Sequence, residues 1–248
     1  MTASSPDRQS HLISTILTPA VRLFLRTQVE RAENLQIKIQ GGDRQLLSGY
    51  IPEIFLAAQR VIYQGLHLSQ MQVKGENIRI NLGQVVRGKP LKLLEIIPVT
   101  AEMQLEEADL NASLGSDLMV AGIADLLVKL LAVHPALANR SLPSDPAALK
   151  LKPEQMVMAP DRLTLSATVM DAAGQAIPLI IRTGLTVAEG RKLCFEHPCQ
   201  LNQLHDEEGQ PLVELHGFAI DLGPEVNIQA LTLDHGRLTC YGQIQIIP

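Results

Sequence analysis

The segment that most constrains the fold runs from Met103 to His134. It opens with alternating apolar and polar residues, the period of a half-buried strand, and changes at Glu106 to a helical period. From Leu118 to Val133 the predicted helix is apolar on nearly every side, and only Asp125 and Lys129 are charged. Such a helix is normally covered on most sides, and it is shorter than the roughly 20 continuous apolar residues of a membrane span. We therefore expect strands from both halves of the chain to enclose it.

This predicted helix has a recognisable beginning. Gly115 interrupts the pattern, and Ser116 with Asp117 offers an N-cap just before the apolar run. Two interpretations of the apolar stripe stay open, namely ordinary core packing and the lining of a cavity for an apolar ligand. Burial of its seven large side chains would contribute about 10–20 kcal/mol, at roughly 1.5–3 kcal/mol each. These side chains are Leu118, Met119, Ile123, Leu126, Leu127, Leu130 and Leu131.

Composition limits the classes of function. The 248 residues are 46% hydrophobic but only 3% aromatic, and their formal net charge is −5. A nucleic-acid-binding protein normally shows a basic face with interleaved aromatic side chains, so we expect no nucleic-acid partner. Three cysteines are an odd number, which does not fit a disulfide framework and favours a reducing compartment. Residues 1–9 begin no signal-peptide pattern, and we expect a cytoplasmic protein, free or peripheral on a membrane.

The N-terminal segment predicts an amphipathic helix after a disordered tip at residues 1–9. Residues 10–31 have a helical period, with arginines largely off the apolar stripe. Pro19 breaks this pattern unless Thr18 and Pro19 are the N-cap and first residue of the longer piece. The favoured interpretation is a terminal helix packed on its own domain. The alternatives are a helix that docks on anionic lipid or on a protein partner.

The rest of the chain predicts strands joined by turns. Alternating residues predict strands between 35 and 106, interrupted by a basic loop at 83–90. Five prolines between 134 and 160 predict a linker without regular structure. The second half predicts consecutive antiparallel strands with short turns. We expect residues 1–33 to hold the tip and N-terminal helix, and residues 34–248 to form one domain.

The sequence contains no familiar catalytic motif. A nucleophile elbow, a P-loop, a dinucleotide-binding glycine pattern and a metalloprotease motif are all missing. On a strand, Cys194 and His197 would face opposite ways, so ordinary strand residues are a better interpretation than a zinc site. The potential zinc ligands are Cys194, His197 and Cys199, with Cys240 or His216 as a fourth.

Asp109 and Asn111 could be a catalytic carboxylate and the residue that orients it. No histidine or lysine is placed nearby in the sequence to act with them. A role in capping the start of a helix is the favoured interpretation. We therefore predict a protein that is not an enzyme, with no catalytic residue, no metal and no cofactor.

Several strings of the sequence resemble a known family. Together they resemble the LmeA-type phospholipid-binding family, in the form found in photosynthetic bacteria. The most specific part is the Asp109-Leu110-Asn111 helix start after a strand that ends at Glu106. The resemblance implies lipid binding without catalysis, and a fold like that of tubular lipid-binding proteins. The strings are residues 17–28, 61–69, 78–91, 106–116 and 218–226.

The expected fold class is therefore α+β, with a strongly curved antiparallel sheet wrapping a long apolar helix, plus an N-terminal amphipathic helix. The expected function is phospholipid binding, peripheral to an inner or photosynthetic membrane. Head groups or the membrane would be contacted by Arg22, Arg26 and Arg87. The alternative is a protein-interaction or scaffold module with a fully packed core and no lipid, which meets a protein partner through its N-terminal helix. Acyl chains would contact Leu114, Leu118, Ile123, Leu126, Leu127 and Leu130.

Overall fold

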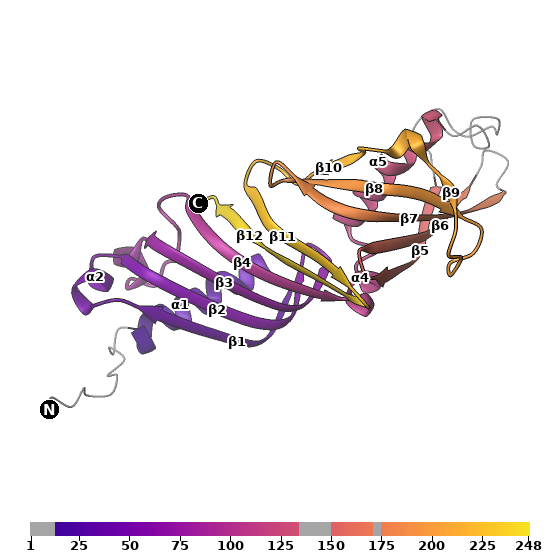
Figure 1. Cartoon of the computed structure of the whole chain (residues 1–248). Coiled ribbons are helices and arrows are strands. Elements are labelled where there is room, and N and C mark those ends of the chain that lie inside the picture. The colour runs from indigo at the N-terminus through magenta and orange to yellow at the C-terminus, as the bar shows by residue number, and fades with distance from the viewer. Residues whose placement is uncertain (1–12, 134–149, 171–174) are drawn as a thin grey trace, which may run out of the picture.

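Two antiparallel β-sheets, arranged end to end, make up most of the molecule (Figure 1). The computed structural model describes residues 13–133, 150–170 and 175–248. The first sheet combines strands from both ends of the chain, in the order β1-β2-β3-β4-β12-β11. Its strands are β1 (Arg31–Gln40), β2 (Tyr50–Tyr63), β3 (Leu66–Arg79), β4 (Ile97–Glu106), β11 (Val226–Asp234) and β12 (Arg237–Ile246).

The second sheet is built only from residues between 150 and 221. Its strand order is β10-β8-β7-β6-β5, and β9 pairs with β8 outside this path. Neighbouring strands pair antiparallel, as the short turns predicted. Its strands are β5 (Lys150–Ala159), β6 (Arg162–Met170), β7 (Ala176–Ala188), β8 (Lys192–Leu201), β9 (Gln210–Pro211) and β10 (Ala219–Asp221).

The helices lie on the faces and at the ends of these sheets (Figure 1). Pro19 lies in the first turn of α1, but the N-cap is Leu17 and not Thr18 as expected, and the helix ends at Gln28, earlier than expected. The expected N-cap of α5 is confirmed, because the N–H of Met119 donates to Ser116 Oγ at 3.3 Å. The boundary expected at residue 33 stays a prediction. The helices are η1 (Ile13–Leu17), α1 (Thr18–Gln28), α2 (Asp43–Leu47), α3 (Leu82–Val85), α4 (Glu107–Ala112), α5 (Asp117–Val133) and η3 (Val213–Leu215).

The curled antiparallel sheet and the N-terminal helix agree with the expected fold, but the arrangement around α5 does not. We expected one sheet, with strands from both halves, to wrap this helix. Instead β12 pairs with β4 along its whole length, from Ile97 opposite Ile246 to Glu106 opposite Arg237. β4 is thus paired on both sides, with β3 and with β12, and offers no free edge to β5. β5 therefore belongs to a separate sheet, and α5 contacts β5 and η3.

The unstructured linker expected at residues 134–160 is wrong for its second part. Residues 150–159 form β5 at the edge of the second sheet, whereas 134–149 lie outside the described residues. The register of β5 against β6 shifts between Pro153 and Gln155. Edge strands and bulges are the places where a sheet tolerates proline, since the missing N–H need not join the ladder.

One face of the first sheet, called here the inner face, carries two apolar clusters. Alternate residues of β4, from Ile97 to Leu105, point to this face. At one end, Ile97 and Val99 belong to the α1 cluster, in which Leu17 and Val21 are buried. At the other end, Leu105 belongs to the α5 cluster, which also contains side chains of α4, α5 and the second sheet. The alternating apolar residues of β4 therefore contribute to both clusters.

α4 joins the two sheets through hydrogen bonds to the free edge of β5. The side chain of Asn111 pairs with Met156 as a neighbouring strand would. Its Oδ1 accepts from the N–H of Met156, and its Nδ2 donates to the C=O of Met156, both at 2.8 Å. Nδ2 also donates to the C=O of Glu107 at 2.8 Å. Asn111 is thus a clamp between the sheets, a role that the sequence did not predict.

The start of α4 is capped by Asp109, as expected. Its Oδ2 accepts from the backbone N–H of Glu106 at 3.3 Å and from the hydroxyl of Ser69. Glu107, the first residue of the helix, faces the second sheet, where its Oε2 accepts from the N–H of Met158 at 2.8 Å. The acidic residues at this helix start therefore fix α4 on both of its neighbours.

Candidate functional site

Four of the six residues predicted to contact acyl chains meet in the α5 cluster. Each is at most 7% exposed. They pack with Leu105 of the first sheet and with Met158 and Leu165 of the second. The side chains of the other two, Leu118 and Leu127, lie outside the described residues. The four are Leu114, Ile123, Leu126 and Leu130.

The outer face of α5 is more apolar than a solvated helix face usually is. Asp125 and Lys129 are exposed there, as the sequence predicted. Val120 and Val128 are exposed as well, at 44% and 38%. Among the side chains of α5 that the structure describes, one side is buried and the other is exposed, which differs from the expectation of enclosure on most sides.

A band of partly exposed apolar side chains crosses the inner face of the first sheet between the two clusters. Met71 of β3 lies opposite Met103 of β4, and the neighbouring pair is Val73 with Ala101. The sequence predicted these strands, but alternation alone does not show whether a helix covers the apolar face. This central band consists of Leu35, Ile37, Leu56, Met71, Val73 and Met103.

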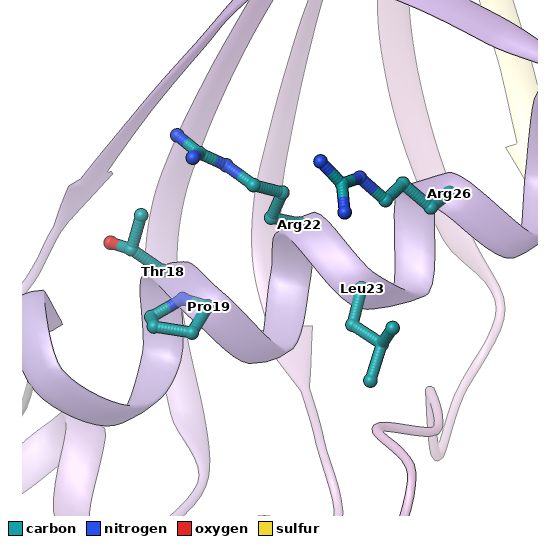
Figure 2. A pocket seen from close by; sticks show the side chains of 5 residues that line it. All are labelled: Thr18, Pro19, Arg22, Leu23 and Arg26. Atoms are coloured by element: carbon teal, nitrogen blue, oxygen red, sulfur yellow. The ribbon is translucent and has the colours of Figure 1, made fainter.

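Arg22 and Arg26, two of the predicted head-group residues, lie together on the exposed side of α1. They line a depression of about 420 Å³ with Thr18, Pro19 and Leu23. Figure 2 shows both guanidinium groups on one side of the helix and the Leu23 side chain on the other. α1 contains no acidic residue, so this surface is basic.

Arg87, the third predicted head-group residue, lies elsewhere. It is exposed in the segment that follows α3, and it does not line the depression on α1. The structure therefore brings together two of the three predicted head-group residues and places the third at the end of the first sheet.

A second depression, of about 580 Å³, lies on the second sheet. Two arginines line it, Arg162 and Arg182, and the guanidinium of Arg182 is used structurally, because it donates to the backbone C=O groups of Asp206 and Glu207. No residue of α5 lines either of these two depressions. The described members of the α5 cluster are buried against one another.

The potential zinc ligands are divided between the sheets. Cys194 and Cys199 lie on β8, whereas Cys240 is buried on β12 of the first sheet. The rings of His197 and His216 face each other with centroids 6.4 Å apart. Across residues 13–133, 150–170 and 175–248, no three His, Cys, Asp or Glu side chains form a group that could hold a metal ion. Burial raises the pKa of the Cys240 thiol.

A curled antiparallel sheet with an apolar inner face is compatible with a protein that holds an apolar ligand. The chain belongs to a family described as LmeA-like phospholipid-binding, whose model matches residues 9–243. The family resemblance found in the sequence is therefore confirmed. No curated protein and no solved structure matches the chain. No helix among the described residues is both long enough and apolar enough to cross a membrane.

Proposed function

We propose that this protein binds phospholipid without catalysing a reaction, at the periphery of a membrane. Membership of a phospholipid-binding family supports the ligand class. The observation that carries the proposal is the inner face of the first sheet, where the partly exposed apolar band continues into the α5 cluster. A bilayer or a bound acyl chain would remove this band from water.

Acyl chains would enter from the central band and extend toward α5. Met71 and Met103 lie side by side in the band and pack on the α5 cluster. Methionine is unbranched and adaptable, so such side chains can move aside for a flexible ligand. Leu126 and Leu130, which are buried in the same cluster, would form the far end of the site.

The lipid phosphate would be held by Arg22 and Arg26. They are four residues apart on one helix, and therefore neighbours on its surface. A guanidinium group can donate two parallel hydrogen bonds to a phosphate. Both side chains are exposed, and α1 itself contains no acidic residue that would compete for them.

Lipid extraction tests this function directly. The protein purified from its native membrane-containing lysate should release phospholipid that mass spectrometry detects, and it should take up a fluorescent phospholipid from vesicles. Met103→Lys places a charge in the central band and should lower this uptake. Gln104→Lys is the matched control, because it makes the same charge change on the opposite face of the same strand.

Two results would contradict the proposal. One is a folded wild-type protein that neither releases nor takes up phospholipid. The other is equal uptake by the Met103→Lys and Gln104→Lys variants, each with a cooperative thermal transition that shows it is folded.

An interaction module without lipid is the second candidate. It is favoured by the burial of the α5 side chains that belong to the α5 cluster. None of these described side chains lines either depression. In that case the exposed side of α1 would contact a protein. Replacing Leu23, which is 60% exposed, by Glu would then remove a co-purifying protein and leave phospholipid uptake absent in both forms.

A further inference from the structure

Exposed apolar side chains gather at one end of the first sheet. Among the described residues, five of the eleven large hydrophobic side chains classed as exposed lie there, each 57–66% exposed. They come from α2, from the segment between α3 and β4, and from the residue after β12. In Figure 1, α2 lies at the far end of the first sheet, and the C-terminus lies at the same ends of the strands on the β12 side. The five are Leu47, Val86, Leu94, Ile96 and Ile247.

Strand pairing places these residues at the same end although they are far apart in sequence. Ile80 pairs with Leu93, next to Leu94. The last residue of β12, Ile246, lies opposite the first residue of β4, Ile97, so Ile247 and Ile96 are neighbours just beyond it. We call the surface formed by residues 43–47, 79–96 and 247 the α2–α3 end.

The α2–α3 end holds its apolar side chains outward on an ordered framework. Asn81 Oδ1 accepts from the N–H of Lys92 at 2.7 Å, and its Nδ2 donates to the C=O of Pro90 at 3.1 Å. Leu82 and Leu91 are buried in the α1 cluster. The segment therefore already contributes residues to the core, and its Val86, Leu94 and Ile96 side chains remain exposed.

The charge of this end is opposite to that of the whole chain. The formal net charge of the protein is −5. Among the described residues, only Arg79 of the five cations at this end lies within 4 Å of a carboxylate, that of Glu95 at 3.6 Å. The cations are Arg44, Arg79, Arg87, Lys89 and Lys92, and the nearby acidic residues are Asp43, Glu95 and Glu225.

We propose that the α2–α3 end docks on the surface of an anionic phospholipid bilayer. Its exposed leucine, valine and isoleucine side chains enter the interface, and its cations meet the lipid phosphates. Apolar burial together with attraction to anionic lipid is the combination that holds proteins on such surfaces. The inference rests on the proposed function and names the surface that meets the membrane. The experiment below tests this surface separately from the proposed lipid site.

Vesicle co-sedimentation of the full chain tests the inference. The vesicles contain phosphatidylcholine with about one third phosphatidylglycerol, and pure phosphatidylcholine vesicles are the comparison. The wild-type protein should bind the anionic vesicles more strongly. Binding should weaken when NaCl rises from about 0.1 to 1 M, which shortens the Debye length from about 10 to 3 Å.

Two variants remove the two attractions in turn. Leu94→Ser with Ile96→Ser removes apolar side chains that are already exposed, so the fold should persist. Arg87→Glu with Lys89→Glu reverses two charges, and should lower binding to anionic vesicles by roughly tenfold or more. Val213→Ser is the matched control, because Val213 is 74% exposed on the side of the second sheet, and it should bind as the wild-type protein does.

The outcomes separate the proposals. Variants at the α2–α3 end that bind vesicles like the wild-type protein overturn the docking inference, whatever lipid the protein carries. Loss of vesicle binding with bound phospholipid still extractable supports both proposals, and loss of binding by a protein that never carried lipid supports docking alone. If the variants instead sediment as monomers where the wild-type protein sediments as a dimer, and their vesicle binding is unchanged, this end contacts a second copy of the chain and the inference is overturned.

Discussion

Replacing Asn111 by alanine should destabilise the protein strongly, because this side chain makes two of the three side-chain hydrogen bonds that join α4 to β5. Its amide makes hydrogen bonds of 2.8 Å to both backbone groups of Met156 and to the C=O of Glu107. Met156 is only 5% exposed, so water replaces these partners poorly. The substitution leaves a backbone N–H and a backbone C=O of β5 without partners at the edge of the sheet.

The magnitude follows from these two groups. An unsatisfied buried donor or acceptor costs about 1–3 kcal/mol, and Asn111 itself is half-buried, which lowers the cost. We expect a loss of about 2–4 kcal/mol in the free energy of unfolding, a large part of the roughly 5–15 kcal/mol of a typical domain. Asn111→Asp should also be destabilising, because it keeps the acceptor for the N–H of Met156 but places a carboxylate against two carbonyl oxygens.

Urea unfolding followed by circular dichroism measures the change. The exposed Asn202 offers the control, since Asn202→Ala should change stability by no more than about 0.5 kcal/mol. If the two sheets lose their coupling, the Asn111→Ala transition should also become broader or biphasic. A loss below about 0.5 kcal/mol with an unchanged transition would refute the clamp.

Three further changes test other parts of the structure. Gly65→Ala should cost roughly 1–3 kcal/mol by thermal unfolding, because Gly65 has φ +74° and an added Cβ would lie 2.9 Å from the Cβ of Ser116; an unchanged melting temperature would contradict this. Burial raises the folded-state pKa of Cys240, so the thiol's contribution to stability is full below about pH 8.5, the pKa of an unfolded thiol. This contribution is lost as the pH rises through the folded-state pKa. Cys240→Ala should flatten this alkaline decline in stability, and an identical decline in the variant would refute the assignment. Arg22→Glu with Arg26→Glu should reduce uptake of anionic phospholipid from vesicles and leave the urea midpoint nearly unchanged, since both side chains are exposed; undiminished uptake would exclude them as head-group ligands.

The sequence by itself determined the local elements. The alternation through Met103 and Leu105 predicted β4, and the change of period at Glu106 predicted the following helix start. The cap at Ser116 and the proline in the first turn of α1 were predicted as well. These features depend on neighbours within a few residues, so periodicity and capping rules reach them. The family could also be predicted from the sequence, because the segments that carry the resemblance are short runs of consecutive residues.

Only the tertiary structure decided which elements meet. Asn111 looks like an ordinary helix residue until β5, 45 positions later, supplies Met156 as its partner. The last part of the proline-rich segment, residues 150–159, forms β5, where an edge position tolerates Pro153. Alternation marks the apolar side of a strand but does not choose its partner, and here the pairing of β4 with β12 divided one expected sheet into two. The central band and the α2–α3 end exist only after that choice, since each collects residues that pairing, and not sequence distance, brings together.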